Sequence, residues 1–339
     1  MDKLKFAIIG CGRIGQRHAV HIQNSGMLAA VCDVIPEKAQ EVGKKYNANA
    51  YTSIEDLLKA EEHLDVIAIC TPNGLHAEHS IKALKAGINV LCEKPMALSV
   101  RECGEMIKTA ENANKRLFIV KQNRFNPPVE AIKKLLDEEK LGKIYSVQLN
   151  CFWNRDAAYY HNSWKGTKKL DGGTLFTQFS HFIDLLYWMI GDVKQAKAFT
   201  GNYAHEGMIE FEDTGVISFL LSEHNAPGVM HYTTSAFQKN MEGSITIFAE
   251  RATIKIGGKY LNAIEYQVTD GFDIGDIPES SPANNYGDYE GSMSNHDKVI
   301  DNVVKSLQGK GEIMTNAYDG LKTVEIIENI YQLASHGRN

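Results

Sequence analysis

The chain has 339 residues, long enough for two domains, and its content of 43% hydrophobic and 23% charged residues is typical of a soluble globular protein. The formal net charge of −6 provides no general basic surface for nucleic acid or anionic membranes, and no apolar run reaches the length of a membrane-spanning helix. The N-terminus also lacks the pattern of a secretory signal, so we expect a cytoplasmic protein with neither nucleic acid nor membrane as a partner.

The first predicted elements are a strand, a tight turn and a helix. The apolar run Lys5–Ile9 is followed by the pattern GxGxxG and then by a helical pattern. In dinucleotide-binding units these glycines make the turn, admit the pyrophosphate and let helix and strand pack closely. A second apolar run ends at Asp33, where a carboxylate can bind a ribose 2′-hydroxyl and repel a 2′-phosphate. We therefore predict an NAD site that includes Gly10, Gly12, Arg13, Ile14, Gly15 and Asp33.

Helix and strand patterns alternate up to about residue 120, which predicts a doubly wound parallel sheet. Strands are expected at 66–70, 88–92 and 117–120, and helices at 36–46, from 53, at 75–86 and at 99–114. Ligands of such sheets bind at the carboxyl ends of the strands. We therefore predict a Rossmann domain over residues 1–123, with further cofactor-binding residues Thr71, Pro72, Asn73, His76, Glu93, Lys94 and Gln122.

The pattern changes in the second half of the chain. From Ile144 to Trp153 apolar and polar residues alternate, with Tyr145, Val147, Leu149, Cys151 and Trp153 on one face, as in a half-buried strand. Residues 124–339 are thus predicted to form an α+β domain with an open, largely antiparallel sheet. Further strands are expected at 193–200, 216–221, 228–234, 244–249 and 252–256, helices at 129–139, 175–190, 296–308 and 317–335, and a long irregular loop at 270–294.

One face of that sheet is expected to be covered by helices. The other would expose large side chains such as Phe152, which predicts a homo-oligomer, either a dimer or a tetramer.

Neither cysteines nor histidines predict a metal site. The six cysteines show no CxxC spacing, and most of them are expected to be reduced. His76 and His79 lie at a helix start, and no metal site is predicted there.

A polar stripe marks the helix that follows Gly172 and Gly173. Thr177, His181, Asp184 and Trp188 recur at helical spacing on an otherwise apolar segment. Taken alone, His181 is better explained as a core histidine than as a catalyst.

The order of the motifs changes that interpretation. GxGxxG, Asp33, Thr71-Pro72-Asn73, Glu93-Lys94-Pro95 and the glycine-initiated helix with HxxD together resemble the glucose–fructose oxidoreductase and inositol dehydrogenase (Gfo/Idh/MocA) family over essentially the whole chain. The resemblance implies that Lys94 and His181 are catalytic residues beside the nicotinamide, in a cleft between the domains. We assign His181 as the general base and Lys94 as the group that stabilises the alkoxide, and the two roles could be exchanged.

A closer resemblance lies in the segments 121–127, 164–167 and 171–173. They are similar to bacterial 3-dehydrogenases of UDP-N-acetylglucosamine or its uronate, which supply amino sugars for lipopolysaccharide O-antigen. Many family members have an aspartate where this chain has Thr177, so Asp184 or the substrate would have to supply a charge partner for His181.

The segment 154–169 combines cations with aromatic rings, which suits a nucleotide sugar, although a solvated and slightly basic loop explains it equally well. A dehydrogenase of a free sugar or cyclitol, and a non-catalytic NAD-binding regulator, remain alternatives. The predicted substrate-binding residues are Lys94, Arg124, Asn126, Arg155, Tyr160, Trp164, Lys165, Thr177, Gln178 and His181.

Overall fold

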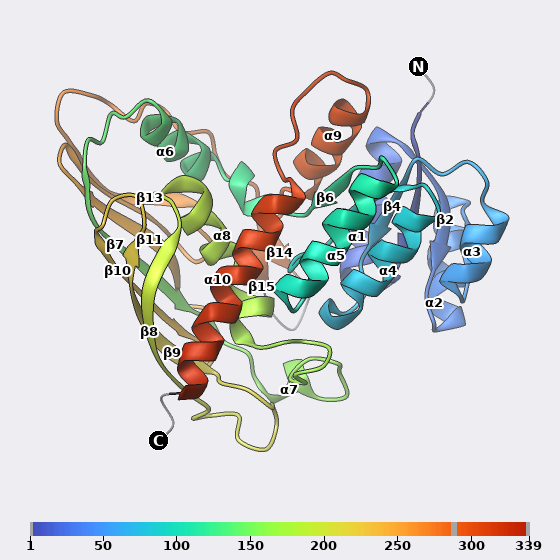
Figure 1. The fold of residues 1–339 in the computed structure, drawn as a ribbon, viewed down its shortest axis with the longest axis horizontal. Coiled ribbons are helices and arrows are strands. Elements are labelled where there is room, and N and C mark those ends of the chain that lie inside the picture. The colour runs from blue at the N-terminus through green and yellow to red at the C-terminus, as the bar shows by residue number, and fades with distance from the viewer. Residues whose placement is uncertain (1–2, 286–289, 337–339) are drawn as a thin grey trace. The chain divides into compact units, whose positions relative to one another are not determined.

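The structure is a computed structural model that describes residues 3–285 and 290–336. It contains two compact units (Figure 1). The first comprises Met1–Lys121 and His296–Val324, and the second comprises Gln122–Asn295 and Glu325–Asn339. The sequence predicts a single boundary after residue 123, whereas the chain returns to the first unit. The reason is that α9 (His296–Leu307) packs against α1 (Arg13–Ser25).

The first unit is built on a six-stranded parallel sheet in the order β3-β2-β1-β4-β5-β6. This is the order of a doubly wound dinucleotide-binding sheet, and the predicted α/β fold class is confirmed. All four residues of β4 are buried, as expected for a central parallel strand. The strands are β1 (Lys5–Ile9), β2 (Met27–Cys32), β3 (Asn49–Tyr51), β4 (Val66–Ile69), β5 (Asn89–Cys92) and β6 (Leu117–Ile119).

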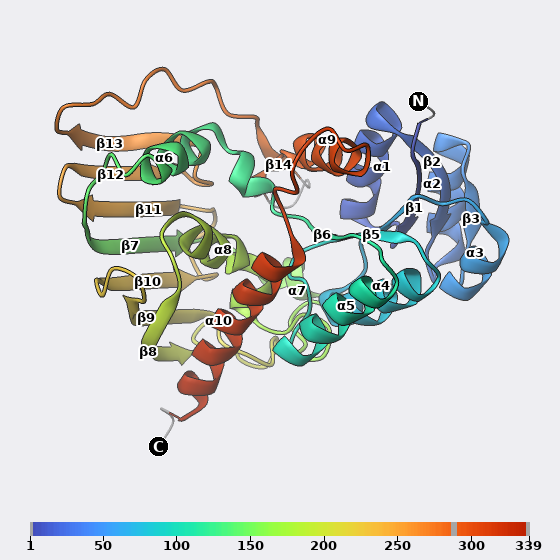
Figure 2. The same ribbon diagram turned by 45° about the horizontal axis from the view of Figure 1, so that its top comes forward.

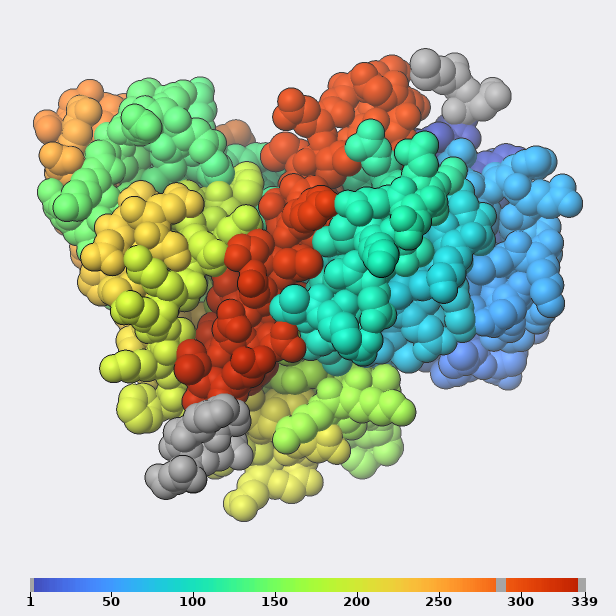
Figure 3. Space-filling model, viewed as in Figure 1, coloured from blue at the N-terminus to red at the C-terminus, as the bar shows by residue number. Residues whose placement is uncertain are grey.

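Helices cover both faces of this sheet. Figure 2 shows α1 and α9 on one face, and α4 (His76–Lys85) and α5 (Val100–Asn112) on the other. The space-filling view shows α4 and α5 as a continuous outer surface of the unit (Figure 3). Helix α1 buries Gly15, His18, Ala19 and Ile22, a stripe at spacings of three and four. The remaining elements are α2 (Pro36–Tyr46), α3 (Ile54–Ala60) and the short η1 (Asn73–Leu75).

The second unit is built on a seven-stranded sheet in the order β13-β12-β11-β7-β10-β9-β8 (Figure 2). All neighbouring strands pair antiparallel except β10 and β7, which are parallel. The strands are β7 (Ile144–Phe152), β8 (Val193–Gly201), β9 (Thr214–Leu221), β10 (Pro227–Thr233), β11 (Glu242–Ala249), β12 (Ala252–Gly257) and β13 (Ala263–Thr269).

One face of this sheet carries the apolar core. Ile183 of α8 (Ser180–Met189) and Ile330 of α10 (Ala317–His336) face Ile217 and Met230 of the strands. The other face of the sheet is the open one. The unit also contains η2 (Gln122–Phe125), α6 (Pro127–Asp137), α7 (Ala157–Tyr160) and a π-helical segment, η3 (Leu175–Phe179), directly before α8.

Several local predictions were wrong. Tyr145 is 51% exposed, although alternation placed it with the buried residues of β7, because the pairing with β11 shifts register next to it. Strand β13 and helix α7 were missed, since β13 is almost wholly exposed and α7 spans one turn. The predicted irregular loop contains two paired strands, β14 (Ala283–Asn285) and β15 (Glu290–Met293).

All six cysteines are buried and free, as predicted. Across residues 3–285 and 290–336, none of the helices combines the length and apolar character that spanning a membrane requires.

Candidate functional site

The glycine turn after β1 has the geometry that a pyrophosphate requires. Gly10 has a φ of +97°, and a Cβ there would lie 2.5 Å from the carbonyl oxygen of Cys70. A Cβ on Gly15 would lie 1.9 Å from the carbonyl oxygen of Gly10, so helix and turn pack too closely for a side chain. Around Gly12, which caps α1, a Cβ would meet nothing within 4 Å. The first and third glycines are therefore needed for packing, and the second leaves space for the dinucleotide beside the helix N-terminus. Arg13 is exposed and Ile14 is partly exposed at the start of α1.

Asp33 lies at the carboxyl end of β2 beside this turn. One carboxylate oxygen accepts from the backbone N–H of Cys11 at 2.8 Å and the other from that of Ile35 at 2.9 Å. An ionised carboxylate can accept about four hydrogen bonds. Two backbone bonds therefore orient the group and leave acceptor capacity for a ribose diol, which fits the predicted role.

Two loops at the carboxyl edge of the sheet are tied together by His76. Its Nδ1 lies 2.7 Å from the carbonyl oxygen of Pro95, and its Nε2 lies 2.9 Å from that of Thr71. Burial lowers the pKa of His76, although its hydrogen bonds to these two carbonyls oppose the shift. His76 therefore holds the loops that carry Asn73 and Lys94. Asn73 is buried, whereas Thr71, Pro72 and Lys94 are partly exposed.

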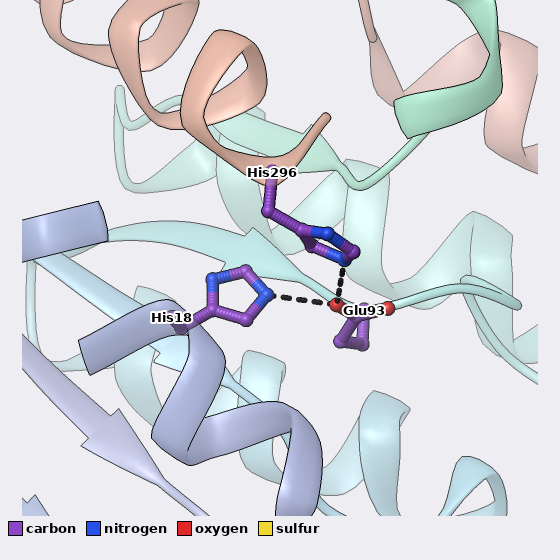
Figure 4. Close-up of side chains that lie close together, drawn as sticks. All are labelled: His18, Glu93 and His296. Atoms are coloured by element: carbon purple, nitrogen blue, oxygen red, sulfur yellow. Dashed lines mark hydrogen bonds and ion pairs between the residues drawn. The ribbon is translucent and has the colours of Figure 1, made fainter. Parts of the chain in front are cut away.

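The carboxylate of Glu93 lies beside His18 and His296 in the first unit (Figure 4). Its Oε1 lies 2.7 Å from Nε2 of His18 and 3.5 Å from Nε2 of His296, and its Oε2 accepts from the backbone N–H of Lys94 at 3.1 Å. Among the described residues, these three side chains are the one group of histidine, cysteine and carboxylate whose potential metal-ligand atoms converge. The sequence analysis did not single out His18 or His296. The sequence signal that could have identified His18 was its position in the buried stripe of α1.

In the second unit, His181 is in contact with Gln122. The Gln122 amide nitrogen lies 3.3 Å from Nε2 of His181 and 3.0 Å from the hydroxyl of Ser292. An amide N–H can only donate, so this bond uses the lone pair on Nε2. Gln122, predicted as a cofactor residue, therefore lies beside the candidate base, and both side chains are buried.

The polar stripe of α8 has a structural cause that the sequence did not reveal. Asp184 forms a bidentate ion pair with Arg124, with bonds of 2.9 and 2.7 Å, and the guanidinium stacks over the ring of Trp188 at 4.9 Å. Both charged side chains are almost fully buried. The expectation that Asp184 could balance a charge on His181 is therefore weakened, because the charge of Asp184 is already balanced by Arg124. Arg124, which was predicted to bind substrate, thus forms a buried ion pair within the second unit.

Thr177 is also bound within the unit. Its hydroxyl donates to Asp171, both to the carbonyl oxygen and to the carboxylate. The π-helical segment η3 inserts an extra residue between Gly173 and His181, so the four residues of the predicted stripe do not follow one regular helix.

A pair formed by Tyr331 and the buried Glu212 supports the start of η3. The Tyr331 hydroxyl accepts from the backbone N–H of Leu175 at 2.9 Å and donates to Glu212 at 2.7 Å. Burial raises the pKa of Glu212 to about 7, although hydrogen bonds from Tyr331 and Tyr232 lower it. A Cβ on Gly173 would lie 2.4 Å from this hydroxyl, which explains the glycine there.

Arg155 is enclosed by protein rather than presented to solvent. It is 3% exposed, lies over the rings of Trp153 and Tyr159, and donates to the side chain of Gln178 at 2.8 Å. Gln178 in turn donates to the Tyr159 hydroxyl at 2.7 Å. These contacts give Arg155 and Gln178 a structural role in this segment, and the substrate-binding role of both residues stays a prediction.

The other predicted substrate residues divide into buried and partly exposed ones. Tyr160 is buried against the ring of His205, and burial raises the pKa of its hydroxyl. Asn126 is fully buried and bonds to the carbonyl oxygens of Tyr260 and Leu261. Trp164 and Lys165 are partly exposed, and the Lys165 ammonium lies 3.8 Å from the centre of the Tyr159 ring.

Comparisons with known proteins agree with this geometry. Residues 4–121 match the oxidoreductase family with NAD-binding Rossmann fold, and residues 129–255 match the GFO/IDH/MocA C-terminal domain. The WlbA dehydrogenase from Chromobacterium violaceum, solved with NADH and UDP-GlcNAcA, is 34% identical, with a TM-score of 0.90 over 100% of this chain and 95% of that chain. The WlbA dehydrogenase from Bordetella pertussis, solved with the same ligands, is 33% identical, with a TM-score of 0.87 over 99% of this chain and 97% of that chain.

Curated relatives match over regions of different length, and the glucose-6-phosphate 3-dehydrogenase from Bacillus subtilis is 24% identical over 98% of this chain and 97% of that protein. The 2,7-anhydro-N-acetylneuraminate hydratase from Mediterraneibacter gnavus is 30% identical over 211 residues, which are 61% of this chain and 55% of that protein. The matched region thus spans about half the length of that relative. The two family matches together cover more than half of the sequence. The chain therefore belongs to the GFO/IDH/MocA oxidoreductase family, and its first unit is an NAD-binding Rossmann domain.

Proposed function

We propose that this chain is an NAD-dependent dehydrogenase that oxidises a secondary alcohol of a nucleotide sugar, at C3 of UDP-N-acetylglucosamine or its uronate. The observation that carries the proposal is the similarity, over the whole chain, to WlbA dehydrogenases solved with NADH and UDP-GlcNAcA. In this proposal the reaction supplies amino sugars for lipopolysaccharide O-antigen.

The reaction requires two protein groups beside the bound dinucleotide. NAD supplies the hydride acceptor when it is bound. His181 removes the proton of the substrate hydroxyl, and the Lys94 ammonium stabilises the negative charge that develops on the oxygen. Two contacts to the backbone around Lys94 support this role, because the Glu93 carboxylate binds the Lys94 N–H and His76 binds the carbonyl of the following Pro95. For His181, the support is its position directly after the π-helical segment, a type of distortion that is frequent at functional sites.

Lys165 is the cation that we propose for the substrate diphosphate. Arg155 and Arg124 are buried, whereas Lys165 is partly exposed and lies against the face of Tyr159. A cation and an adjacent ring suit the diphosphate and base of a nucleotide sugar.

Replacing Lys165 with Ala is expected to raise the KM for the UDP-sugar and to change activity on a free sugar little, because only the UDP-sugar carries the diphosphate. Initial rates with UDP-N-acetylglucosamine, its uronate, a free hexose and inositol would be measured for both proteins, with exposed Lys143→Ala as control. Thermal shift with the same panel in the presence of NAD would report binding independently, since a ligand of the native state stabilises it.

Equal losses on nucleotide and free sugars, or turnover of inositol without turnover of any UDP-sugar, would favour a dehydrogenase of free sugars or cyclitols. NAD binding without turnover of any of these alcohols would favour the regulator instead.

We further propose that the open face of the seven-stranded sheet forms a homo-oligomer interface, giving a dimer or tetramer. Phe199 is 82% exposed and pairs in register with Val216, and Phe152 stacks on the edge of His231 on the same sheet. Large apolar side chains gathered on one sheet face are typical of a surface that contacts another subunit.

Light scattering at micromolar concentration is therefore expected to give a multiple of the 37.7 kDa subunit mass, and Phe199→Asp is expected to shift the population towards smaller species. A monomer for the unmodified protein would reject the proposed interface.

A further inference from the structure

Two buried histidines from distant segments meet at one buried carboxylate in the first unit. Figure 4 shows His18 on α1, Glu93 after β5 and His296 at the start of α9, with both imidazole rings directed at Glu93. His18 is 0% exposed, His296 1% and Glu93 6%. A carboxylate in such surroundings must be paired with hydrogen-bond donors. Because the acceptor is a carboxylate, Nε2 of His18 must carry the hydrogen of the 2.7 Å bond.

The second oxygen of this carboxylate holds the backbone of Lys94. Oε1 is bound by His18 at 2.7 Å and lies 3.5 Å from His296, while Oε2 accepts from the Lys94 N–H at 3.1 Å. One residue further on, the carbonyl of Pro95 is held by His76 at 2.7 Å. The backbone on both sides of the Lys94 side chain is therefore fixed by buried groups of the same unit.

The charges in the cluster favour an ionised carboxylate. Burial tends to raise the pKa of Glu93, but the hydrogen bond from His18 and the neighbouring imidazole of His296 outweigh it and hold the pKa well below its usual value. Burial lowers the pKa of His296, and the nearby charge of Arg17 acts in the same direction. A hydrogen bond to an ionised carboxylate is roughly twice as strong as one between neutral groups.

We propose that His18 and His296 are positioning residues for Lys94, which act by orienting the Glu93 carboxylate that holds the Lys94 backbone. This inference rests on the proposed function, since it assumes that Lys94 takes part in the reaction. The proposal assigns a function to His18, which lies in the buried stripe of α1. It also assigns one to His296, at the start of the segment that returns to the first unit.

The same three side chains could in principle bind a divalent cation, but the geometry favours hydrogen bonds. His18 and Glu93 are in direct contact at 2.7 Å, whereas ligands of a tetrahedral zinc ion, each at about 2.0–2.2 Å from it, lie more than about 3 Å apart. Arg17 adds a positive charge nearby.

The test compares His18→Leu, which removes the donor, with His18→Gln, which can place an amide N–H near the position of Nε2. His21→Leu, a half-buried histidine on the same helix, is the matched control. Hydrogen–deuterium exchange of the Lys94 amide, read by mass spectrometry of peptides that span it, reports the bond to Glu93 without any substrate. Initial rates on the best UDP-sugar give kcat and KM.

We expect His18→Leu to accelerate exchange at Lys94 and to lower kcat by about 10- to 100-fold with little change in KM, because misplacement of a reacting group acts on the chemical step. His18→Gln should recover most of both losses, and His21→Leu should resemble the unmodified protein. If His18→Leu does not fold, His296→Leu is expected to show the same pattern.

If exchange of the Lys94 amide is unchanged in His18→Leu, the proposal is overturned, whatever the substrate. Faster exchange together with a kcat equal to that of the unmodified protein also overturns it. A stoichiometric divalent cation in the purified protein, found by elemental analysis, would also overturn it in favour of a metal site. If the unmodified protein turns over no sugar, the proposed function fails, and the exchange result still decides whether His18 holds the Lys94 backbone.

Discussion

Changing Lys94 to Met or His181 to Ala is expected to lower turnover by about 10²- to 10⁴-fold, the usual contribution of a positioned acid–base group. Removal of a hydride from carbon requires that the hydroxyl lose its proton and that the negative charge on oxygen be stabilised. Without His181 the proton has no acceptor of suitable basicity, and without Lys94 the alkoxide loses its cation. Both losses act on the transition state, so kcat should fall more than KM rises.

NAD affinity is the control for both variants. Neither residue belongs to the glycine turn or to the Asp33 carboxylate, so calorimetry should give nearly the unmodified Kd. Exposed Lys85→Met and His63→Ala provide matched changes of the same residue types, and both should keep full turnover. Near-normal turnover in either test variant would exclude that residue from the mechanism. Loss of NAD binding would indicate a folding defect in His181→Ala, and in Lys94→Met either a folding defect or a direct contact of Lys94 with the cofactor.

The elements of the first unit could be predicted because their signals are local. Each buried parallel strand is a short apolar run, and helices α3 and α5 begin at Ser53 and Ser99, whose side chains cap them. The short, mostly exposed strand β3 has no such signal and was missed. The place of the segment 296–324 could not be predicted in this way. Its helical pattern shows that one face is apolar, but not that this face packs on α1 instead of on the neighbouring elements of the second unit.

The family and the NAD-binding fold were confirmed because motif order is a property of the sequence. The binding partners of individual polar residues were harder to predict, because they depend on contacts between positions that are far apart in the sequence. Asp184 and Arg124 are 60 residues apart, and His18 and Glu93 are 75 apart. Spacing along α8 identified a polar stripe, but a buried ion pair and a catalytic group produce the same pattern.

The buried ion pair between Arg124 and Asp184 gives the second prediction with a large effect, on the free energy of unfolding. Changing Arg124 to Met is expected to lower the free energy of unfolding by about 3–5 kcal/mol, because it leaves the Asp184 carboxylate buried without its bidentate partner. The loss should appear as a lower midpoint in urea denaturation. Arg101→Met, which removes the exposed pair with Glu105, is the control and should cost no more than about 1 kcal/mol.

The double variant Arg124→Met, Asp184→Leu separates a structural role from substrate binding. Replacing both members of a buried pair with apolar side chains is often neutral or stabilising, so most of the lost stability should return. If Arg124 serves only to neutralise Asp184, the double variant should also recover KM for the UDP-sugar. Recovered stability with a persistently raised KM would instead assign Arg124 to the substrate, and an unchanged urea midpoint in the single variant would contradict the ion pair as a stabilising contact.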